Sequence, residues 1–315
     1  MVKLIKIKGD ASFRTFFRKV NVQQNSIIVS AKKEKFQNLI VYDAINKILR
    51  KNKLLAPDLY NENYRKNFIE IEDFGNKSML NEIKKKNKNK FNYFKKIIDL
   101  LIKVQLIKDR KVYTFKNKKY SIPKYDKRIL VQEANLFCDW YVKSKLSKIE
   151  SKKFSKEFRK VTKKLASKLM SNQDVFVHRD FHVSNLMLVK KSIGIIDSQD
   201  ALIGNRAYDL ASLIDDVRLK TSKSFKKKIF NFYIKRQKKI NVYKLKNDFE
   251  ILSILRNLKI IGIFTRLAIR DGKKNYLKFI PYAWQLIGMR INENEVFKEL
   301  KNLLNQKFKK KLNED

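Results

Sequence analysis

The stretch Val177-His178-Arg179-Asp180-Phe181-His182-Val183-Ser184-Asn185, followed by Gly194-Ile195-Ile196-Asp197, is the most polar cluster of the chain and decides its fold. Both histidines of the 315 residues lie in it. Asp180 and Asn185 have the spacing H-R-D-x-x-x-x-N of a catalytic loop. Apolar runs at 175–177, 186–189 and 193–196 predict short strands around it. Asp197 ends the last run, so we expect its carboxylate at a strand end.

These residue types suit the transfer of a phosphoryl group. An aspartate such as Asp180 orients an acceptor hydroxyl and takes its proton, while the Asn185 amide oxygen and the Asp197 carboxylate hold Mg²⁺ at the phosphates. A single loop aspartate is more often a turn residue. The whole polar set at this spacing, between two strand signals, favours catalysis. The sequence therefore predicts a phosphotransferase that uses ATP and Mg²⁺.

Outside the motif, the first 75 residues differ in periodicity from the rest. They predict strands at 4–7, 16–22, 27–31, 58–60 and 68–71 around one helix at 36–49. The remainder has mainly the helical period, with helices expected at 91–107, 129–146, 154–170, 225–240, 249–269 and 296–303, and a charged loop at 108–124. We expect an α+β fold like that of protein kinases. One phosphotransferase domain would comprise a β-rich nucleotide-binding lobe at 1–75 and a helical lobe at 76–315 with the catalytic loop and substrate site.

The charge of the chain is strongly positive. Lys and Arg number 74 against 31 Asp and Glu, a net charge of +43. Lysines predominate and are spread along the whole chain, whereas a nucleic-acid surface favours arginine; we therefore expect no specific nucleic-acid partner. The single cysteine, Cys138, excludes an intrachain disulfide, and the longest uncharged run (279–289) is too short to span a bilayer. We expect a cytoplasmic monomer with no membrane partner.

The motif resembles the aminoglycoside phosphotransferase and choline kinase superfamily, whose signature is an H-x-D-x-H-x-x-N loop followed by I-D at a strand end. Protein kinases match poorly, because the chain has no G-x-G-x-x-G loop, no D-F-G at 197–199 and no A-P-E; it has no P-loop either. Within the superfamily, 9–18 (GDASFRTFFR), 197–210 and 256–276 are similar to the bacterial cell-wall amino-sugar kinases, as are Glu133 and Trp140. Those enzymes phosphorylate the anomeric hydroxyl of N-acetylmuramate and N-acetylglucosamine.

The resemblance assigns a role to each residue that matches the superfamily's pattern. It implies that Asp180 is the catalytic base and that Asn185 and Asp197 are the Mg²⁺ ligands. The nucleotide would be contacted by the hairpin loop near the N-terminus of the chain, by a lysine after the third strand (Lys32 or Lys33) and by the interlobe connection. The residues concerned are Gly9, Ala11, Ser12, Phe13, Arg14, Lys32 and Glu72. Asp209 would brace the catalytic loop. The acceptor would meet His182, Glu133, Trp140, Arg266 and Arg270.

Several alternatives stay open. Arg266 and Arg270 are as consistent with a solvated helix face as with contact to substrate, and Trp140 and Phe137 suit the helical core better than a sugar face. The acceptor could instead be choline, homoserine or an aminoglycoside. A non-catalytic protein that keeps the fold and binds polyanions is the alternative from another class, but intact Asp180, Asn185 and Asp197 argue against it.

Overall fold

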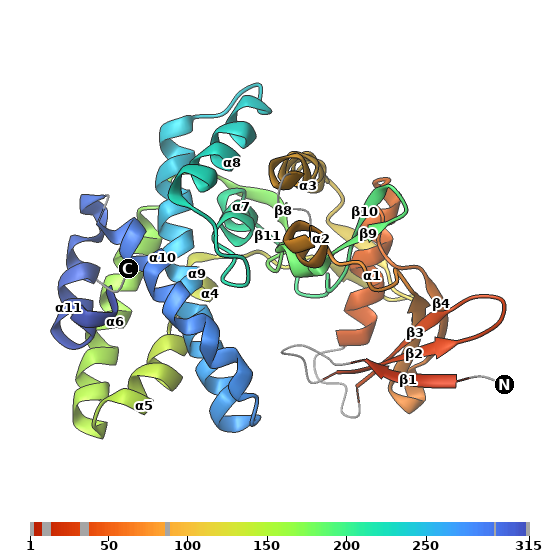
Figure 1. Cartoon of the computed structure of the whole chain (residues 1–315), viewed down its shortest axis with the longest axis horizontal. Coiled ribbons are helices and arrows are strands. Elements are labelled where there is room, and N and C mark those ends of the chain that lie inside the picture. The colour runs from red at the N-terminus through yellow and green to blue at the C-terminus, as the bar shows by residue number, and fades with distance from the viewer. Residues whose placement is uncertain (1–2, 8–13, 32–37, 86–88, 293, 313–315) are drawn as a thin grey trace. The chain divides into compact units, whose positions relative to one another are not determined.

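The structure is a computed structural model that describes residues 3–7, 14–31, 38–85, 89–292 and 294–312 (Figure 1). Its contacts group the chain into two compact units. The first unit comprises residues 1–123 and 175–203, and the second unit comprises 124–174 and 204–315. The catalytic motif therefore belongs to the same unit as the N-terminal strands. The lobe boundary expected at residue 75 stays a prediction.

An antiparallel sheet with strand order β1-β2-β3-β5-β4 begins the first unit. All five strands lie where the alternation of apolar residues predicted them, as does the helix α1 (Asn38–Lys51). Val29 and Ile69 of the sheet pack with Leu39 and Tyr42 of α1 in one buried cluster. The strand bounds are β1 (Lys3–Ile7), β2 (Thr15–Val20), β3 (Ser26–Ser30), β4 (Leu59–Asn63) and β5 (Phe68–Glu72).

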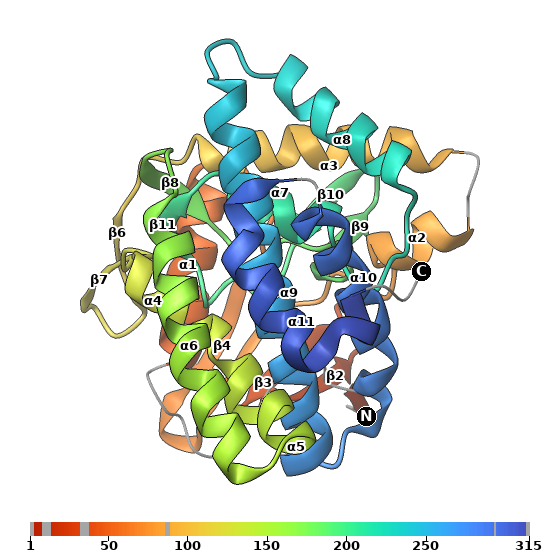
Figure 2. The same cartoon turned by 90° about the vertical axis from the view of Figure 1, so that its left-hand side faces the viewer.

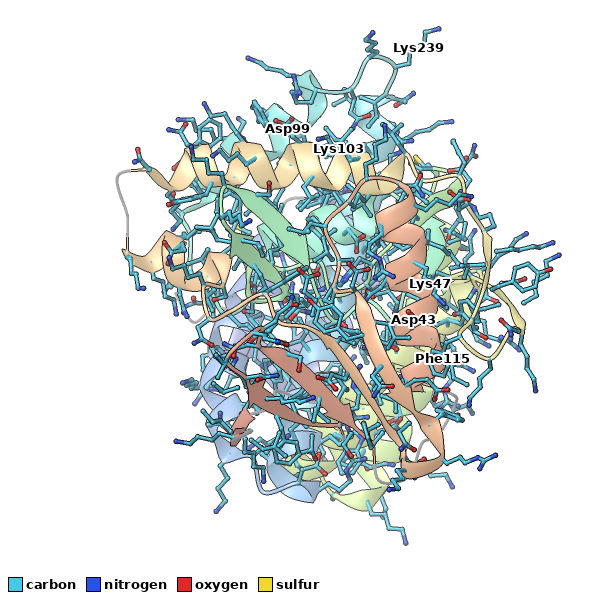
Figure 3. All side chains as sticks on the ribbon, turned by 90° about the vertical axis from the view of Figure 1, so that its right-hand side faces the viewer. Asp43, Lys47, Asp99, Lys103, Phe115 and Lys239 are labelled. Atoms are coloured by element: carbon cyan, nitrogen blue, oxygen red, sulfur yellow. The ribbon has the colours of Figure 1, made fainter. Side chains whose placement is uncertain are left out.

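The charged segment 108–124 was predicted as a loop, and that prediction was wrong. It contains a hairpin of β6 (Lys111–Tyr113) and β7 (Lys119–Ser121). The turn is closed by a hydrogen bond from the Thr114 N–H to the Lys118 carbonyl (3.0 Å). Phe115, labelled in Figure 3, packs edge-on against Tyr64 next to the sheet cluster. The hairpin could not be recognised from its sequence, because most of its side chains, many of them lysines, are exposed and only a few contact the core.

The rest of the first unit places the motif. α2 (Met79–Lys85) and α3 (Lys90–Gln105) follow the sheet, and β9 (Leu186–Val189) pairs with β10 (Ser192–Ile195). β8 (Gln173–Val177) pairs with β11 (Leu202–Asn205), and the 3-10 turn Val183–Asn185 lies inside the motif. Gly194 of β10 lies against the Phe74 ring, where an added Cβ would come within 2.5 Å of a ring carbon. β10 can approach the segment after β5 only because it has a glycine there.

The second unit is helical. Its longest helix, α9 (Val242–Arg270), contacts α4 (Lys127–Ala134), α7 (Ala207–Ile214) and α10 (Ile280–Ile291) (Figures 1 and 2). The run 279–289, noted for its lack of charge, forms most of the buried helix α10. The other helices are α4 (Lys127–Ala134), η3 (Phe137–Val142), α5 (Lys143–Lys145), α6 (Lys148–Ser167), α7 (Ala207–Ile214), α8 (Lys223–Lys235), η5 (Lys274–Phe279), η6 (Glu295–Phe297) and α11 (Lys298–Leu312). In the described ranges, no helix has the length and apolar character needed to cross a membrane.

A π-helix interrupts the helix predicted at 129–146. The segment Phe137–Val142 is wound as a π-helix between α4 and α5. Its first residue, Phe137, is fully buried and stacks on Tyr141, with Phe158 and Trp284 also in contact, so the predicted core role of Phe137 is confirmed. Gly262 of α9 lies against its backbone.

Gly262→Ala is expected to lower the free energy of unfolding by about 1–3 kcal/mol, as overpacked cores do. An added Cβ would lie 2.2 Å from the carbonyl carbon of Leu136, which cannot move independently of the helix backbone. In an open helix the same change stabilises by about 1 kcal/mol. Urea denaturation of the two proteins measures the sign, and a stabilised variant would contradict the close approach of α9 to the π-helix.

Candidate active site

The loop after β8 is held by its own backbone. Arg179 has a left-handed backbone (φ +73°), which turns the chain sharply at the end of the strand. The main-chain oxygen of Asp180 then accepts hydrogen bonds from the His182 N–H (2.9 Å) and from the Asn185 Nδ2 (3.1 Å). Strained backbone of this kind persists where the surroundings enforce it and is common at active sites. The sequence motif is thus a tight loop in which Asn185 fixes the position of Asp180.

His178 supports the loop as a neutral side chain. Its ring is 1 % exposed, and burial lowers the pKa of the imidazole, although Asp180 and Asp197 act in the opposite direction. A backbone hydrogen bond with Ile196 links it to the end of the β9–β10 hairpin. His182, which was predicted to touch the acceptor, is 4 % exposed. We conclude that His178 is a buried support of the loop.

Asp197 lies at the end of β10, as the apolar run predicted. It also has a left-handed backbone (φ +62°), and the side chain is 37 % exposed. The Asn185 carbonyl accepts a hydrogen bond from the Ile196 N–H (3.1 Å), which holds the hairpin end beside the catalytic loop. The two predicted metal ligands therefore belong to one hydrogen-bonded assembly.

Arg14, the residue directly before β2, contacts this assembly. One terminal nitrogen (Nη2) lies 2.7 Å from the Asp197 Oδ1, and the other (Nη1) donates to the Gln199 Oε1 at 2.8 Å. The Arg14 side chain is only 4 % exposed, and its guanidinium also lies over the rings of Phe16 and Tyr42. The structure thus brings the predicted nucleotide residue Arg14 onto the predicted metal ligand Asp197.

The helix α1 anchors the segment 197–199. The Ser198 hydroxyl donates to the Asn46 Oδ1 at 2.6 Å, and the Asn46 Nδ2 donates to the Pro57 carbonyl. Burial, together with the negative charge of Asp197, raises the pKa of Tyr42 to about 12, so the phenol stays neutral. The sequence analysis missed Tyr42 and Asn46, because nothing in a helical period distinguishes a helix residue that contacts a distant loop.

A chain of polar contacts leads from Gln199 back to the catalytic loop. The Gln199 Nε2 donates to Asp200 (2.8 Å), and Arg179 lies 3.6 Å from the Asp200 carboxylate. Burial, followed by the charge of Asp200, raises the pKa of Tyr120 to about 12. Arg14, Gln199, Asp200 and Arg179 therefore connect the two segments that carry the predicted ligands and base.

The connection after β5 is tied to the sheet. Arg18 of β2 makes two hydrogen bonds to Asp73 (2.5 and 2.9 Å) and one to Asn76. The N–H of Glu72 donates to the Asp58 carbonyl, and burial raises the pKa of the Glu72 carboxyl. The expected contact of this connection with the adenine base stays a prediction.

Five of the nucleotide residues predicted from the sequence lie outside the described residues: Gly9, Ala11, Ser12, Phe13 and Lys32. Lys33 does as well. In the helix α1, which follows this lysine pair, the buried carboxylate of Asp43 lies 2.8 Å from Lys47 of the same helix (Figure 3). The lysine that would pair the ATP phosphates stays unidentified.

Four predicted acceptor residues belong to the second unit. Glu133 lies 3.0 Å from Lys259 and accepts a hydrogen bond from the Tyr125 hydroxyl. Trp140 is half-buried in the π-helix. Arg270 is exposed and donates two hydrogen bonds to the Asp271 carboxylate. Burial, together with the charge of Arg270, lowers the pKa of Arg266. The buried Nε of Arg266 has no hydrogen-bond partner in the described part of the chain.

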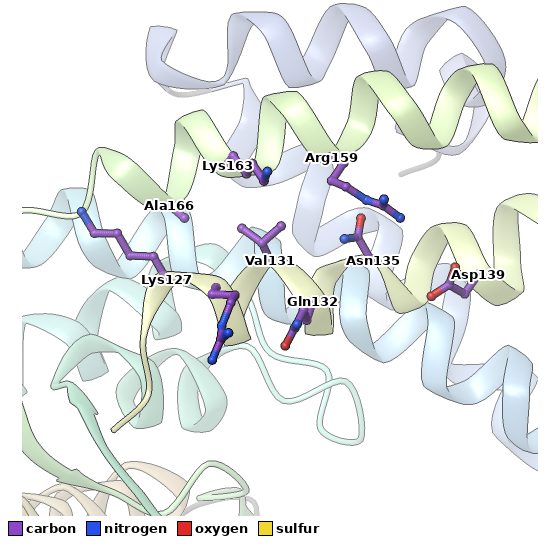
Figure 4. A pocket seen from close by; sticks show the side chains of 9 residues that line it. Lys127, Val131, Gln132, Asn135, Asp139, Arg159, Lys163 and Ala166 are labelled. Atoms are coloured by element: carbon purple, nitrogen blue, oxygen red, sulfur yellow. The ribbon is translucent and has the colours of Figure 1, made fainter. Parts of the chain in front are cut away.

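Two hollows lie along α6 in the second unit, with volumes of about 600 and 870 Å³. They share Asp139, Arg159 and Lys163, and most of their other charged residues are lysines; Figure 4 shows the first of them. None of the predicted site residues lines them.

Asp209, which was predicted to brace the catalytic loop, is 1 % exposed and lies in the first turn of α7.

The oxygen atoms that Asn185 and Asp197 offer are of the kind that binds Mg²⁺. Mg²⁺ is usually bound by one or two protein carboxylates together with waters and substrate phosphates. The amide nitrogen of Asn185 is bonded to the Asp180 carbonyl, which leaves the amide oxygen as the free end. Asp197 supplies a partly exposed carboxylate. Among the residues described, no group of three or more His, Cys, Asp or Glu side chains able to hold a metal occurs.

Asn185→Ala and Asp197→Ala are expected to raise the Mg²⁺ concentration needed for half-maximal activity by about tenfold and to lower turnover, because each removes one ligand. Kinetic titration with Mg²⁺ at saturating nucleotide measures both effects. Asp174→Ala, which removes an exposed carboxylate of β8 without a proposed ligand role, is the control. A fall in turnover with an unchanged Mg²⁺ requirement would assign Asn185 and Asp197 a structural role.

Comparisons with known proteins identify the family of this chain. Residues 3–239 match the phosphotransferase enzyme family. The chain is 27 % identical over 282 residues to the N-acetylmuramate/N-acetylglucosamine kinase of Neisseria meningitidis, covering 87 % of this chain and 81 % of that protein.

Solved structures show the same fold. An ethanolamine kinase of Plasmodium vivax has a TM-score of 0.64 and 15 % identity, covering 98 % of this chain and 84 % of its own. An ADP-bound aminoglycoside phosphotransferase has a TM-score of 0.58 and 15 % identity, covering 90 % and 92 %. These similarities confirm the kinase-like α+β fold and the resemblance to the aminoglycoside phosphotransferase and choline kinase superfamily. Because the family match spans three quarters of its length, the chain belongs to the phosphotransferase enzyme family.

Proposed function

We propose that this protein is an ATP-dependent kinase that phosphorylates the anomeric hydroxyl of N-acetylmuramate or N-acetylglucosamine. The observation that carries the proposal is the hydrogen-bonded assembly of Asp180, Asn185 and Asp197. The Neisseria relative, named for these two sugars and similar over most of its length, supports the acceptor. The ADP-bound structure of similar fold supports the nucleotide. The product would enter cell-wall recycling in the cytoplasm, and we expect the enzyme to act as a monomer.

Asp180 is the residue that handles the proton. The acceptor oxygen attacks the γ-phosphorus of ATP, a new O–P bond forms, and the bond between the γ-phosphorus and the bridging oxygen breaks to release ADP. The hydroxyl proton goes to the Asp180 carboxylate late in a loose transition state. An anomeric hydroxyl is more acidic than an ordinary sugar alcohol, so this aspartate has mainly to orient it. Bound Mg²⁺, held by Asn185 and Asp197, would neutralise phosphate charge.

The remaining predicted contacts divide between the two substrates. The loop at 9–13, Arg14, Lys32 and the connection at Glu72 are proposed for ATP. His182, Glu133, Trp140, Arg266 and Arg270 are proposed for the amino sugar. The lactyl carboxylate of N-acetylmuramate needs a cation with a free donor. Arg266 has such a donor in its Nε, whereas Arg270 is bonded to Asp271.

Arg266→Met is therefore expected to reduce kcat/KM for N-acetylmuramate about tenfold more than for N-acetylglucosamine, since a hydrogen bond to a charged group contributes about 1.5–3 kcal/mol. Lys244→Met removes a positive charge from an exposed position of the same helix and is the matched control. Steady-state kinetics with both sugars measures the ratio. Equal losses on the two sugars in the Arg266 variant would exclude a contact with the lactyl group.

A panel of acceptors tests the proposed function. The protein is incubated with ATP, Mg²⁺ and each of N-acetylmuramate, N-acetylglucosamine, choline, homoserine and an aminoglycoside, and phosphorus NMR identifies the product. A 1-phosphate of either amino sugar supports the proposal. A 6-phosphate, or turnover of another acceptor alone, overturns the acceptor and leaves the kinase. Absence of ATP-dependent phosphorylation of every acceptor would favour the non-catalytic polyanion-binding alternative.

A further inference from the structure

The contact between Arg14 and Asp197 is unusual for this chain. Most of its basic residues are exposed lysines, but the Arg14 guanidinium is almost completely buried. A buried charge is costly unless it is paired and hydrogen-bonded. Two of its polar partners, Asp197 and Gln199, come from the segment that directly follows β10. The burial therefore reflects a specific contact and not the general excess of lysine.

The guanidinium lies where it competes with a metal ion. Its Nη2 is 2.7 Å from the Asp197 Oδ1, while Mg²⁺ binds a carboxylate oxygen at about 2.0–2.1 Å. A guanidinium at this distance and a divalent cation on the same carboxylate repel each other, and the burial of Arg14 strengthens this repulsion on one side of the partly exposed carboxylate. Mg²⁺ that binds the Oδ1 must displace the guanidinium, and Mg²⁺ that binds the Oδ2 still lies close to its charge.

We propose that Arg14 is the counter-ion of Asp197 in the nucleotide-free protein and that it yields this carboxylate to Mg²⁺ when ATP binds. This inference rests on the proposed role of Asp197 as a metal ligand. The released guanidinium then exchanges the carboxylate for a phosphate oxygen of the bound nucleotide. The charge of the nucleotide thus compensates both cations, and the free protein binds the metal poorly.

Nucleotide and metal then bind cooperatively, and the coupling is reciprocal because it is a property of the equilibrium. Removing the Arg14 charge strengthens metal binding by the nucleotide-free protein and weakens the coupling between metal and nucleotide. A merely structural role of Arg14 predicts no gain in metal affinity.

Titration of the full-length, nucleotide-free protein with Mn²⁺, followed by electron paramagnetic resonance of the free ion, tests the proposal. Arg14→Met keeps an apolar stem between Phe16 and Tyr42 and is expected to bind Mn²⁺ about tenfold more tightly than the wild type, the equivalent of about 1.4 kcal/mol of relieved repulsion. Arg18→Met, which removes the other arginine–aspartate pair of β2, is the matched control and is expected to bind like the wild type. With a non-hydrolysable ATP analogue present, the difference between wild type and Arg14→Met is expected to shrink.

Two further variants separate the possible outcomes. Arg14→Lys keeps the charge and is expected to remain near the wild type, and thermal melting confirms that each variant is folded. Unchanged or weaker Mn²⁺ binding by Arg14→Met overturns the proposal, as does an equal gain in Arg14→Lys or in Arg18→Met. In the double variant Arg14→Met/Asp197→Asn the gain is expected to disappear. If it persists, the metal assignment of Asp197 itself is wrong, which is a failure of the proposed function and is distinguished in this way from a failure of the exchange alone.

Discussion

Asp180→Asn is expected to reduce turnover by about 10²–10⁴-fold, the range for loss of a positioned acid–base group. The amide keeps the shape of the carboxylate but cannot accept the acceptor's proton. Folding is expected to be preserved, because the hydrogen bonds that shape the loop go to the main-chain oxygen of residue 180. A coupled assay of ADP release with the amino sugar measures the rate, and calorimetry measures the binding of ATP.

Asp174→Asn is the matched control for this substitution. It makes the same charge change at an exposed position on β8, six residues before Asp180. Its turnover is expected to remain within about twofold of the wild type, as for a surface substitution away from the site. Turnover near that of the wild type in Asp180→Asn, with ATP binding intact, would show that another group takes the proton.

Asp215→Asn is expected to lower the free energy of unfolding by about 3–5 kcal/mol, the cost of removing one partner of a buried ion pair. Asp215 is fully buried in the second unit, with Lys226 3.1 Å away and Arg290 3.2 Å away. Ser253 also donates to it at 2.6 Å. Without the carboxylate charge, two largely buried cations face each other. Urea denaturation at pH 7 measures the loss.

The exposed pair of Arg270 and Asp271 provides the control. Asp271→Asn is expected to cost no more than about 1 kcal/mol, because exposed ion pairs contribute little. Equal effects of the Asp215 and Asp271 variants would contradict the buried network.

The same residue predicts a dependence of stability on pH. Burial by itself would raise the pKa of the Asp215 carboxyl. The charges of Lys226 and Arg290 have the larger, opposite effect, and together they lower this pKa from 3.8 to about 2. A group with a lowered folded-state pKa stabilises the fold above its unfolded value and loses that contribution as pH falls. The wild type is therefore expected to lose stability between pH 4 and 2, and Asp215→Asn to lose less over that interval. Parallel slopes of unfolding free energy against pH would show that Asp215 is not the source.

Local patterns were sufficient for most elements. The five N-terminal strands, α1, α3 and the β9–β10 hairpin lie within a few residues of their predicted positions, because a half-buried strand or helix imprints its period on a short window of sequence. The hairpin at 111–121 and the π-helix at 137–142 did not follow from those patterns. The first is mostly exposed, and the second depends on a glycine in α9 that is more than 100 residues away in sequence.

In the candidate site, too, some features follow from local sequence and others depend on tertiary packing. By itself the sequence predicted a base and two metal ligands, since Asp180, Asn185 and Asp197 lie on one loop and one hairpin with fixed spacing. Only the tertiary structure decided that Arg14 pairs with Asp197 across 183 residues and that Asn46 of α1 holds Ser198. Spacing along a chain specifies neighbours within a turn or a hairpin. Which distant side chain compensates a buried charge depends on how sheet and helix pack, and no local period records that.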